Sequence, residues 1–296
     1  NVDLLVAVGG GSAIDAAKGV NVLLGNGGDL RDYAGINKVK KRGLPLIAVP
    51  TTAGTGSEVT IFAVISDVKQ NLKFTITSPL QAPTLAILDP ELTLSLPPML
   101  TAATGMDAMT HAIEAYTSII SQPISDLLSL EAIRLIYRYL PEATYNGANL
   151  RARIEMLKAQ LFAGIAFNSA FLGLSHAIAS PLGAHLHIPH GVANAIMLPY
   201  VMKFNYIASP QKYAEIAEAM GLNLAGKDIY EDAYEAVTAT ERLVKMCNLP
   251  SKLRDVGARE EVLDIVADDA LKSGMLKFNC RTASRDEIRK VLQDAF

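Results

Sequence analysis

The 296-residue chain has few of the features that mark secreted, membrane or nucleic-acid-binding proteins. Its two cysteines, Cys247 and Cys280, lie far apart without CxxC spacing, which argues against a disulfide framework and predicts reduced thiols in a cytoplasmic protein. Glycine, proline or charge interrupts every apolar run before the roughly 18 residues of a membrane span. A formal charge of -3 leaves no basic excess for nucleic acid.

The start of the sequence also lacks familiar features. It has no initiating methionine, and its first eight residues lack the basic region of a signal peptide and read directly into a strand. We therefore expect this sequence to be part of a longer one. The composition is 50% hydrophobic and 19% charged, with a mean hydropathy of +0.24, which predicts a globular protein with a large core.

The apolar pattern changes near residue 95. Before it, short apolar runs bounded by glycine or proline predict strands at 4–8, 46–49, 59–65, 74–77 and 85–88. A predicted helix, Ser12–Leu24, lies between the first two strands, which favours an α/β unit with partly parallel strands. After it, helical periodicity predicts helices at 102–117, 124–139, 152–168, 213–220, 229–246 and 285–295. Two domains are predicted: a strand-bearing one at 1–95 and an all-helical one at 96–296.

A glycine-rich turn follows the first predicted strand. Gly9, Gly10 and Gly11 would let the backbone approach a ligand closely, and Ser12 would cap the helix that follows. The N-terminus of that helix offers unpaired N–H groups to an anion such as a pyrophosphate. The motif is not GxGxxG, and a plain tight turn explains it equally well.

A second loop makes nucleotide binding the better interpretation. Residues 50–58 follow the strand at 46–49 and contain two glycines and four hydroxyls, among them Thr51, Thr52 and Thr55. Such a loop can wrap phosphates or a ribose. Two loops of this kind at the ends of neighbouring strands suit a crevice for a dinucleotide.

All five histidines fall between His111 and His190. On a helix, Asp107 and His111 project from one face, although such a pair alone is usually a surface hydrogen bond. His176 lies in a very apolar segment, where an unpaired imidazole is costly to bury, so it needs a partner. His190 stands between a proline and a glycine, where the chain can bend to aim its ring toward His176.

One carboxylate and three neutral imidazoles suit Fe²⁺ or Zn²⁺ acting as a Lewis acid, with room for one further ligand. The remaining histidines, His185 and His187, fall in a predicted loop. There they would be solvated, line a cleft or carry protons, and solvated loop residues are the favoured interpretation.

Ordered motifs along nearly the whole chain resemble the iron-containing (group III) alcohol dehydrogenases, in the branch of lactaldehyde reductase and of propanediol and butanol dehydrogenases. The motifs that carry the resemblance are 9–12, 50–58, 89–92, 104–116, 176–179, 188–195 and 253–257. The resemblance implies a two-domain plan like that of dehydroquinate synthase. An α/β dinucleotide-binding domain, incomplete here, would precede an all-α metal-binding domain.

The resemblance also implies roles for individual residues. A divalent metal, iron or zinc, would be held by Asp107, His111, His176 and His190. NAD or NADP would be held by Gly9, Gly10, Gly11, Ser12, Thr51, Thr52, Thr55 and Lys73. Phe62 and Phe167 would line the pocket for a short-chain alcohol or aldehyde. The protein would be an NAD(P)-dependent alcohol dehydrogenase or aldehyde reductase and a homo-oligomer.

Three departures from the family pattern affect these expectations. The sequence begins after the units that carry the residue selecting NAD over NADP, so the pattern does not predict that preference. Ser180 stands where the family has a histidine thought to relay protons, which leaves Ser180, His185, water or the cofactor ribose as the proton exit. Cys280 stands where proline is common, which we interpret as a local loop change.

Two alternatives remain open at this point. A truncated or relic protein would keep the metal and nucleotide sites but turn over little substrate. A lyase of the dehydroquinate synthase type would share the two-domain plan, but its phosphate-gripping basic residues are not evident beside the candidate ligands.

Overall fold

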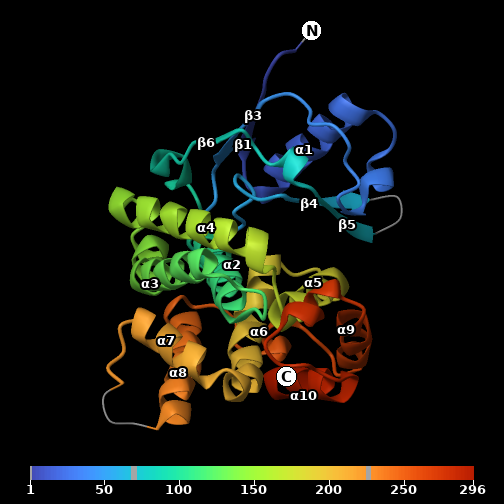
Figure 1. Ribbon diagram of the computed structural model, residues 1–296. Coiled ribbons are helices and arrows are strands. Elements are labelled where there is room, and N and C mark those ends of the chain that lie inside the picture. The colour runs from blue at the N-terminus through green and yellow to red at the C-terminus, as the bar shows by residue number, and fades with distance from the viewer. Residues whose placement is uncertain (1, 68–71, 225–227) are drawn as a thin grey trace.

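The computed structural model describes residues 2–67, 72–224 and 228–296, and only the backbone of residues 67, 72 and 73. A part with strands comes first along the chain and a helical part follows it (Figure 1). The strands are β1 (Leu5–Gly9), β2 (Gly35–Ile36), β3 (Leu46–Pro50), β4 (Phe62–Asp67), β5 (Leu72–Thr77) and β6 (Leu85–Ala86).

One long helix accompanies the strands, and nine further α-helices follow in the described chain, joined by loops and short 3-10 helices. The helices are α1 (Gly11–Asn26), α2 (Pro98–Thr117), α3 (Pro123–Tyr145), α4 (Leu150–Ala170), α5 (Leu174–Leu186), α6 (His190–Asn205), α7 (Pro210–Ala219), α8 (Ile229–Met246), α9 (Glu261–Leu271) and α10 (Arg285–Ala295). Periodicity predicted α1 to α4, α7, α8 and α10. It did not predict α5, α6 and α9.

The strands form two small sheets. In the first, β1, β3 and β6 lie side by side in parallel, which confirms the predicted α/β unit. The register places Gly9 opposite Pro50, so the two predicted cofactor loops leave the same edge of this sheet. In the second sheet, β5 pairs in parallel with β2 and antiparallel with β4.

The strand predicted at 59–65 begins later than expected. β4 starts at Phe62 because Asn168 of α4 holds the preceding backbone in a loop. The Asn168 amide donates to the Val59 carbonyl at 2.8 Å, and its oxygen accepts from the Ile61 N–H at 2.9 Å. These bonds fasten the strand-bearing part to the helical part.

The main hydrophobic core lies in the helical part around α2. From Thr101 to Thr117 every α2 side chain except that of Thr104 is buried, because α3, α4 and α6 pack around this helix. Ala108 and Ala112 are completely buried, and their small side chains allow neighbouring helices to lie close to α2. A buried central helix can hold polar groups at fixed positions.

The change from strands to helices falls between Ala86, where β6 ends, and Pro98, where α2 begins. A domain boundary between residues 95 and 96 stays a prediction. Within the described ranges, no single helix is long and apolar enough to span a membrane; α4 and α5 pass that test on length and composition only as a pair bent by 107°.

Candidate metal centre and cofactor site

The predicted metal ligands converge from three helices. Asp107 and His111 of α2 and His176 of α5 are buried, and their ligand atoms all lie within 4.8 Å of one another. His190 is the first residue of α6, and its Nε2 lies 3.6 Å from Asp107 Oδ1. His176 Nε2 lies 3.8 Å from the same oxygen. The structure therefore gathers four side chains spread over 84 positions of sequence, 107 to 190.

A glycine allows α6 to approach α2 closely enough for this. Gly191 follows His190 at the start of α6, and a Cβ at this position would collide with the Ala103 carbonyl oxygen of α2. Because the glycine removes that collision, the first turn of α6 rests directly on the α2 backbone. The predicted bend at this position thus brings His190 to Asp107.

The protonation of the cluster fits a divalent cation. Burial, the largest influence, lowers the pKa of His111 to about 3, so its ring is neutral near pH 7 and offers a lone pair. Burial acts to raise the pKa of Asp107, but the three histidines and the Asn194 amide outweigh it and lower that pKa. Among the described residues, the buried His111 Nδ1 has no hydrogen-bond partner. Burial acts to lower the pKa of His176, but Glu114 and Asp107 outweigh it and raise that pKa. With its imidazoles deprotonated by an incoming ion, this set of side chains is a suitable donor set for iron or zinc.

Glu114 is the partner that His176 was expected to need, and sequence reasoning did not find it. His176 Nδ1 lies 2.6 Å from Glu114 Oε2, and Glu114 Oε1 accepts the Ser175 N–H at 2.5 Å. A proton held on Nδ1 leaves the Nε2 lone pair facing the centre. A signal was present, because Glu114 lies three residues after His111 and hence on the same side of the helix.

The side chain of Asn194 also lies at the centre and was missed. Its Nδ2 is 2.7 Å from Asp107 Oδ1 and 3.2 Å from both His176 Nε2 and His190 Nε2. Asn194 follows His190 by one helical turn on α6, a spacing that places the two side chains on the same face.

The two glycine-bearing loops touch each other, as their positions after neighbouring strands predicted. The Thr51 N–H donates to the Gly9 carbonyl at 3.0 Å. A Cβ at Gly11 would lie 2.6 Å from the Thr55 side chain, so the glycine allows the loops to meet. A Cβ at Gly10 would lie 3.4 Å from the Thr52 side chain, so these two residues of the loops also lie next to each other.

Ser12 does not cap α1, so that prediction was wrong. The N-cap residue is Gly10, without a side-chain hydrogen bond, and Ser12 lies within the first turn. The chain enters the helix two residues earlier than expected because the Ala13 and Ile14 N–H groups already donate to the Gly10 carbonyl. An uncapped helix N-terminus beside small residues fits a phosphate group.

The second loop reaches from the sheet to the metal helix. The Gly54 N–H donates to Gln160 Oε1 of α4 at 2.5 Å. A Cβ at Gly54 would also lie 2.5 Å from the Thr104 carbonyl oxygen of α2, one turn before Asp107. The loop proposed for the cofactor is therefore in direct contact with the helix that carries two candidate ligands.

Aromatic rings form a wall between the candidate ligands and β4. The Phe62 and Phe167 rings stack with centroids 5.6 Å apart, and Phe167 stacks on His111 at 4.6 Å. These are the two residues that the resemblance assigns to the substrate pocket. The side chain of Lys73, a predicted cofactor contact, lies outside the described residues.

The proposed proton carriers lie along α5, from its middle to its C-terminal end. Ser180 is exposed and follows His176 by one turn. His185 was expected in a loop, which was wrong: α5 continues to Leu186 because the buried Leu182 anchors it in the core. His185 Nε2 lies 2.9 Å from Asp269 Oδ2 of α9. His187 ends the helix in a left-handed conformation and is exposed.

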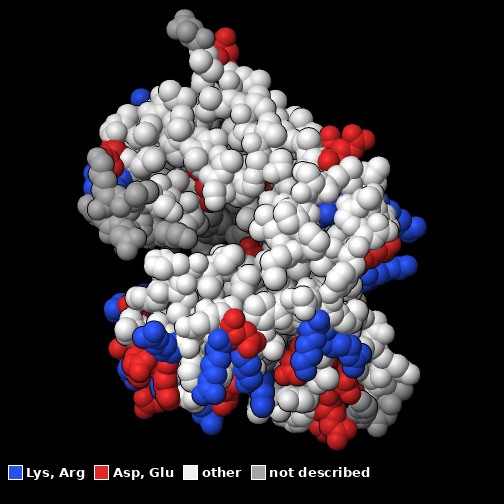
Figure 2. All heavy atoms as spheres, turned by 180° about the vertical axis from the view of Figure 1, so that it is seen from behind, with Lys and Arg blue, Asp and Glu red and all other residues white. Residues whose placement is uncertain are grey.

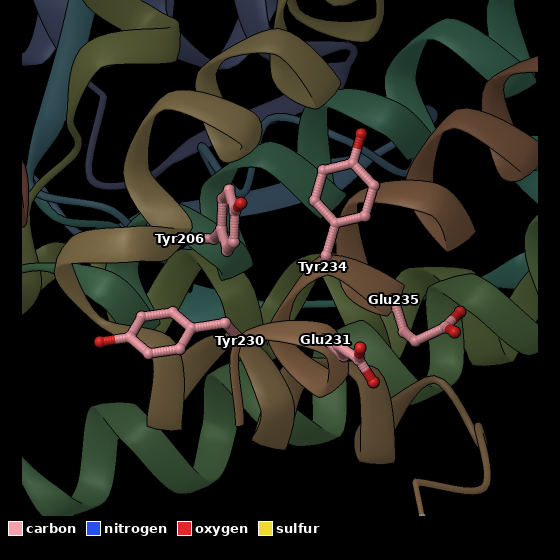
Figure 3. Close-up of a pocket in the computed structure, with 5 residues that line it drawn as sticks. All are labelled: Tyr206, Tyr230, Glu231, Tyr234 and Glu235. Atoms are coloured by element: carbon pink, nitrogen blue, oxygen red, sulfur yellow. The ribbon is translucent and has the colours of Figure 1, made fainter. Parts of the chain in front are cut away.

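The surface is hollowed between the strand-bearing and helical parts, with acidic atoms visible inside (Figure 2). A separate pocket of about 430 Å³ lies beside the start of α8 and is lined by Tyr206, Tyr230, Glu231, Tyr234 and Glu235 (Figure 3). The Tyr230 and Tyr234 hydroxyls point in different directions there. This pocket contains none of the candidate ligands, so we place the chemistry at the convergence of α2, α5 and α6.

Comparison with known families agrees with this arrangement. A family model described as iron-containing alcohol dehydrogenase matches residues 1–90, and one described as the C-terminal part of the Fe-containing alcohol dehydrogenase family matches residues 101–296. The chain belongs to the iron-containing alcohol dehydrogenase family. It is a metal- and NAD(P)-dependent oxidoreductase that acts as an alcohol dehydrogenase or aldehyde reductase.

Individual relatives support the assignment. The 1,3-propanediol dehydrogenase of Klebsiella pneumoniae is 45% identical over 294 residues, which cover 99% of this chain and 76% of the relative. The solved alcohol dehydrogenase from Oenococcus oeni has a TM-score of 0.98 at 43% identity, covering 100% of this chain and 77% of that one. A sulfoacetaldehyde reductase from Bifidobacterium kashiwanohense, solved in complex with NAD+, has a TM-score of 0.90 at 34% identity, covering 99% and 76%.

Two buried ionisable side chains, those of Lys18 and Glu58, lie at the end of the loop formed by residues 50–58. Lys18 of α1 is completely buried and donates to the carbonyls of Thr60 at 3.0 Å and Phe62 at 2.7 Å. Glu58 is 1% exposed, and within the described chain its carboxylate oxygens have no hydrogen-bond partner. Burial lowers the pKa of Lys18 to about 8 and raises that of Glu58 to about 7.

Glu58→Gln should make stability less sensitive to pH. The folded wild type binds the Glu58 proton more tightly than the unfolded chain, whose pKa is near 4.5, so this stabilisation is lost as pH rises toward about 7. The variant has no such loss. As the pH rises from about 5 to about 8, the free energy of unfolding of the variant minus that of the wild type should increase by about 2 to 3 kcal/mol. Urea unfolding across this range measures the difference, and a constant difference would contradict the prediction.

Proposed function

We propose that Asp107, His111, His176 and His190 bind the catalytic divalent ion and that hydride transfer takes place beside them. The convergence of three buried side chains, those of Asp107, His111 and His176, with the exposed His190, next to a loop in contact with α2, is the observation that supports this role. The dinucleotide would lie on the loops that carry the cofactor residues of the sequence analysis. Those residues are Gly9, Gly10, Gly11, Ser12, Thr51, Thr52 and Thr55, and Lys73 of β5 would be a further contact.

Asp107, His111, His176 and His190 would hold a divalent ion, which would supply Lewis-acid chemistry to the substrate oxygen. Asp107 contributes the negative charge of the site, and the neutral histidine rings contribute lone pairs. Phe62 and Phe167 present an apolar wall that excludes water and suits the carbon chain of a short alcohol or aldehyde. The side chain of His190 is 42% exposed, so the substrate would enter on its side of the centre.

We infer that the proton leaves along α5. Ser180 is exposed one turn beyond His176 and is placed to pass a proton to water. His185 is the second candidate, although its bond to Asp269 directs the ring toward α9. Ser180→His should raise the turnover number if this step limits the rate; an unchanged rate would remove Ser180 from the proton path.

The proposal also includes a cytoplasmic location and a homo-oligomeric state. Cys247 and Cys280 are free thiols, which supports a cytoplasmic location. A homo-oligomer is the assembly that the family resemblance implies. Sedimentation of the purified protein tests the second feature, and a monomer at micromolar concentration would contradict it.

A metal-reconstitution assay tests the function itself. The purified protein is treated with chelator, loaded with Fe²⁺ or Zn²⁺ without oxygen, and mixed with NAD(P)H and a panel of short aldehydes, or with NAD(P)+ and alcohols. We expect a change in nicotinamide absorbance only in the loaded protein. Metal binding without any turnover would instead identify a relic that keeps its sites but has lost the reaction.

A further inference from the structure

The Asn194 side chain occupies an unusual position for a buried amide. It is completely buried on α6, and its single nitrogen lies within hydrogen-bond distance of three candidate ligand atoms, at 2.7 Å from Asp107 and 3.2 Å from each of His176 and His190. Each of these atoms carries a lone pair that a divalent ion would use. The amide N–H groups and a divalent ion would therefore bind to the same three ligand atoms.

The chemistry of the three acceptors fixes the orientation of this amide. Asp107 is a carboxylate and can only accept, so an N–H must face it. His176 Nδ1 lies 2.6 Å from Glu114 Oε2. With the proton of a neutral ring on Nδ1 toward this carboxylate, Nε2 presents a lone pair to the amide. The opposite orientation of Asn194 would place a carbonyl oxygen against a carboxylate and imidazole lone pairs, with repulsion at each contact.

This orientation leaves the other polar atom of the Asn194 side chain without a partner. Within the described chain, Asn194 Oδ1 is buried without a hydrogen-bond partner. An unpaired buried carbonyl destabilises the fold unless the other end of the group gains more. The contacts of Asn194 Nδ2 with the candidate ligands supply the stabilisation that offsets the unpaired Oδ1.

We propose that Asn194 is a positioning residue that competes with the metal ion for its own ligands. Without an ion, its amide draws Asp107, His176 and His190 together and compensates the buried carboxylate. A neutral imidazole nitrogen has one lone pair, so the two histidine contacts must be given up when an ion binds. Asp107 has further lone pairs and can keep its bond to the amide. Asn194 thus keeps the site assembled and weakens its affinity for the ion.

The test uses Asn194→Leu, which keeps the approximate shape and removes both polar atoms. The variant loses all three contacts in the ion-free protein but at most one in the ion-bound protein. Its dissociation constant for Co²⁺, measured by competition with a chelating dye, should fall by about fivefold, the equivalent of one ordinary hydrogen bond, because the amide has two N–H donors and keeps the one on Asp107. Its urea midpoint should fall more in chelator than with saturating Co²⁺.

A matched control comes from the same helix. Asn205 is also a buried amide, paired with Asn279 at 2.9 Å and 2.8 Å. Asn205→Leu should lower the urea midpoint equally with and without Co²⁺ and leave the dissociation constant unchanged. Asn194→Ala serves if the leucine variant does not fold, with a smaller gain in affinity because water can replace part of the amide.

The outcomes separate this inference from the proposed function on which it rests. If the wild type binds no Co²⁺, the ligand assignment itself fails. If the wild type binds Co²⁺ and Asn194→Leu binds it more weakly or equally, only the competition is wrong. Tighter binding in Asn194→Leu but not in Asn205→Leu supports it, and none of these readouts requires turnover.

Discussion

Asp107→Ala should remove metal binding and activity together. Asp107 is the only carboxylate among the four candidate ligands, and it lies within 4.8 Å of the His111 and His176 ligand atoms. Without its charge, the ion would face neutral nitrogens in a buried site, where an uncompensated charge is unfavourable. Lewis-acid catalysis contributes several kcal/mol, so the rate should fall by about a thousandfold or more.

Metal content after dialysis and the turnover rate of reconstituted protein measure this effect. Asp126→Ala is the control, because Asp126 is a half-buried aspartate that pairs with Lys212 at 3.6 Å on another helix. It should keep both metal and activity. Circular dichroism should show that Asp107→Ala remains folded in chelator. Retention of one equivalent of metal with wild-type turnover would refute the assignment of Asp107.

Glu114→Gln should weaken metal binding by about 10- to 100-fold, the usual range for a residue that orients a metal-bound histidine. Glu114 Oε1 accepts the Ser175 N–H at 2.5 Å, which a glutamine oxygen can also do. The glutamine NH₂ would then face His176 Nδ1. The imidazole proton would move to Nε2 and block the lone pair that faces the centre.

Competition with a chelating dye for Co²⁺ measures the affinity of Glu114→Gln. Glu131→Gln is the control for loss of a glutamate, because Glu131 is a surface residue paired with Arg134. Activity at saturating metal should recover toward that of the wild type, since Glu114 acts through His176 rather than on the substrate. An unchanged affinity would mean that His176 is oriented by its packing alone.

Local sequence patterns predicted the features that arise within one element. The pair formed by Asp107 and His111 could be predicted because helical spacing places i and i+4 on one face. The glycine-rich turn after β1 could be predicted because three successive glycines follow an apolar run. The meeting of the two cofactor loops followed from the parallel order of neighbouring strands.

Other features could not be predicted because they depend on contacts between distant segments. His185 was expected in a loop. Pro181 is unfavourable inside a helix, yet α5 continues past it to Leu186 with Leu182 fully buried. Ser12 was an expected cap because its side chain suits that position. The backbone instead starts the helix at Gly10, where the second loop packs closely against it.

The amino-acid sequence by itself determined the ligand types, the face of α2 that carries two of them and the small residues of the cofactor loops. Only the tertiary structure decided that His176 and His190 approach Asp107, because Gly191 rests on α2 through packing that no local pattern encodes. It also decided the roles of Glu114 and Asn194. A carboxylate and an amide are common in helices, and they become part of a metal centre only where long-range packing brings them against its ligands.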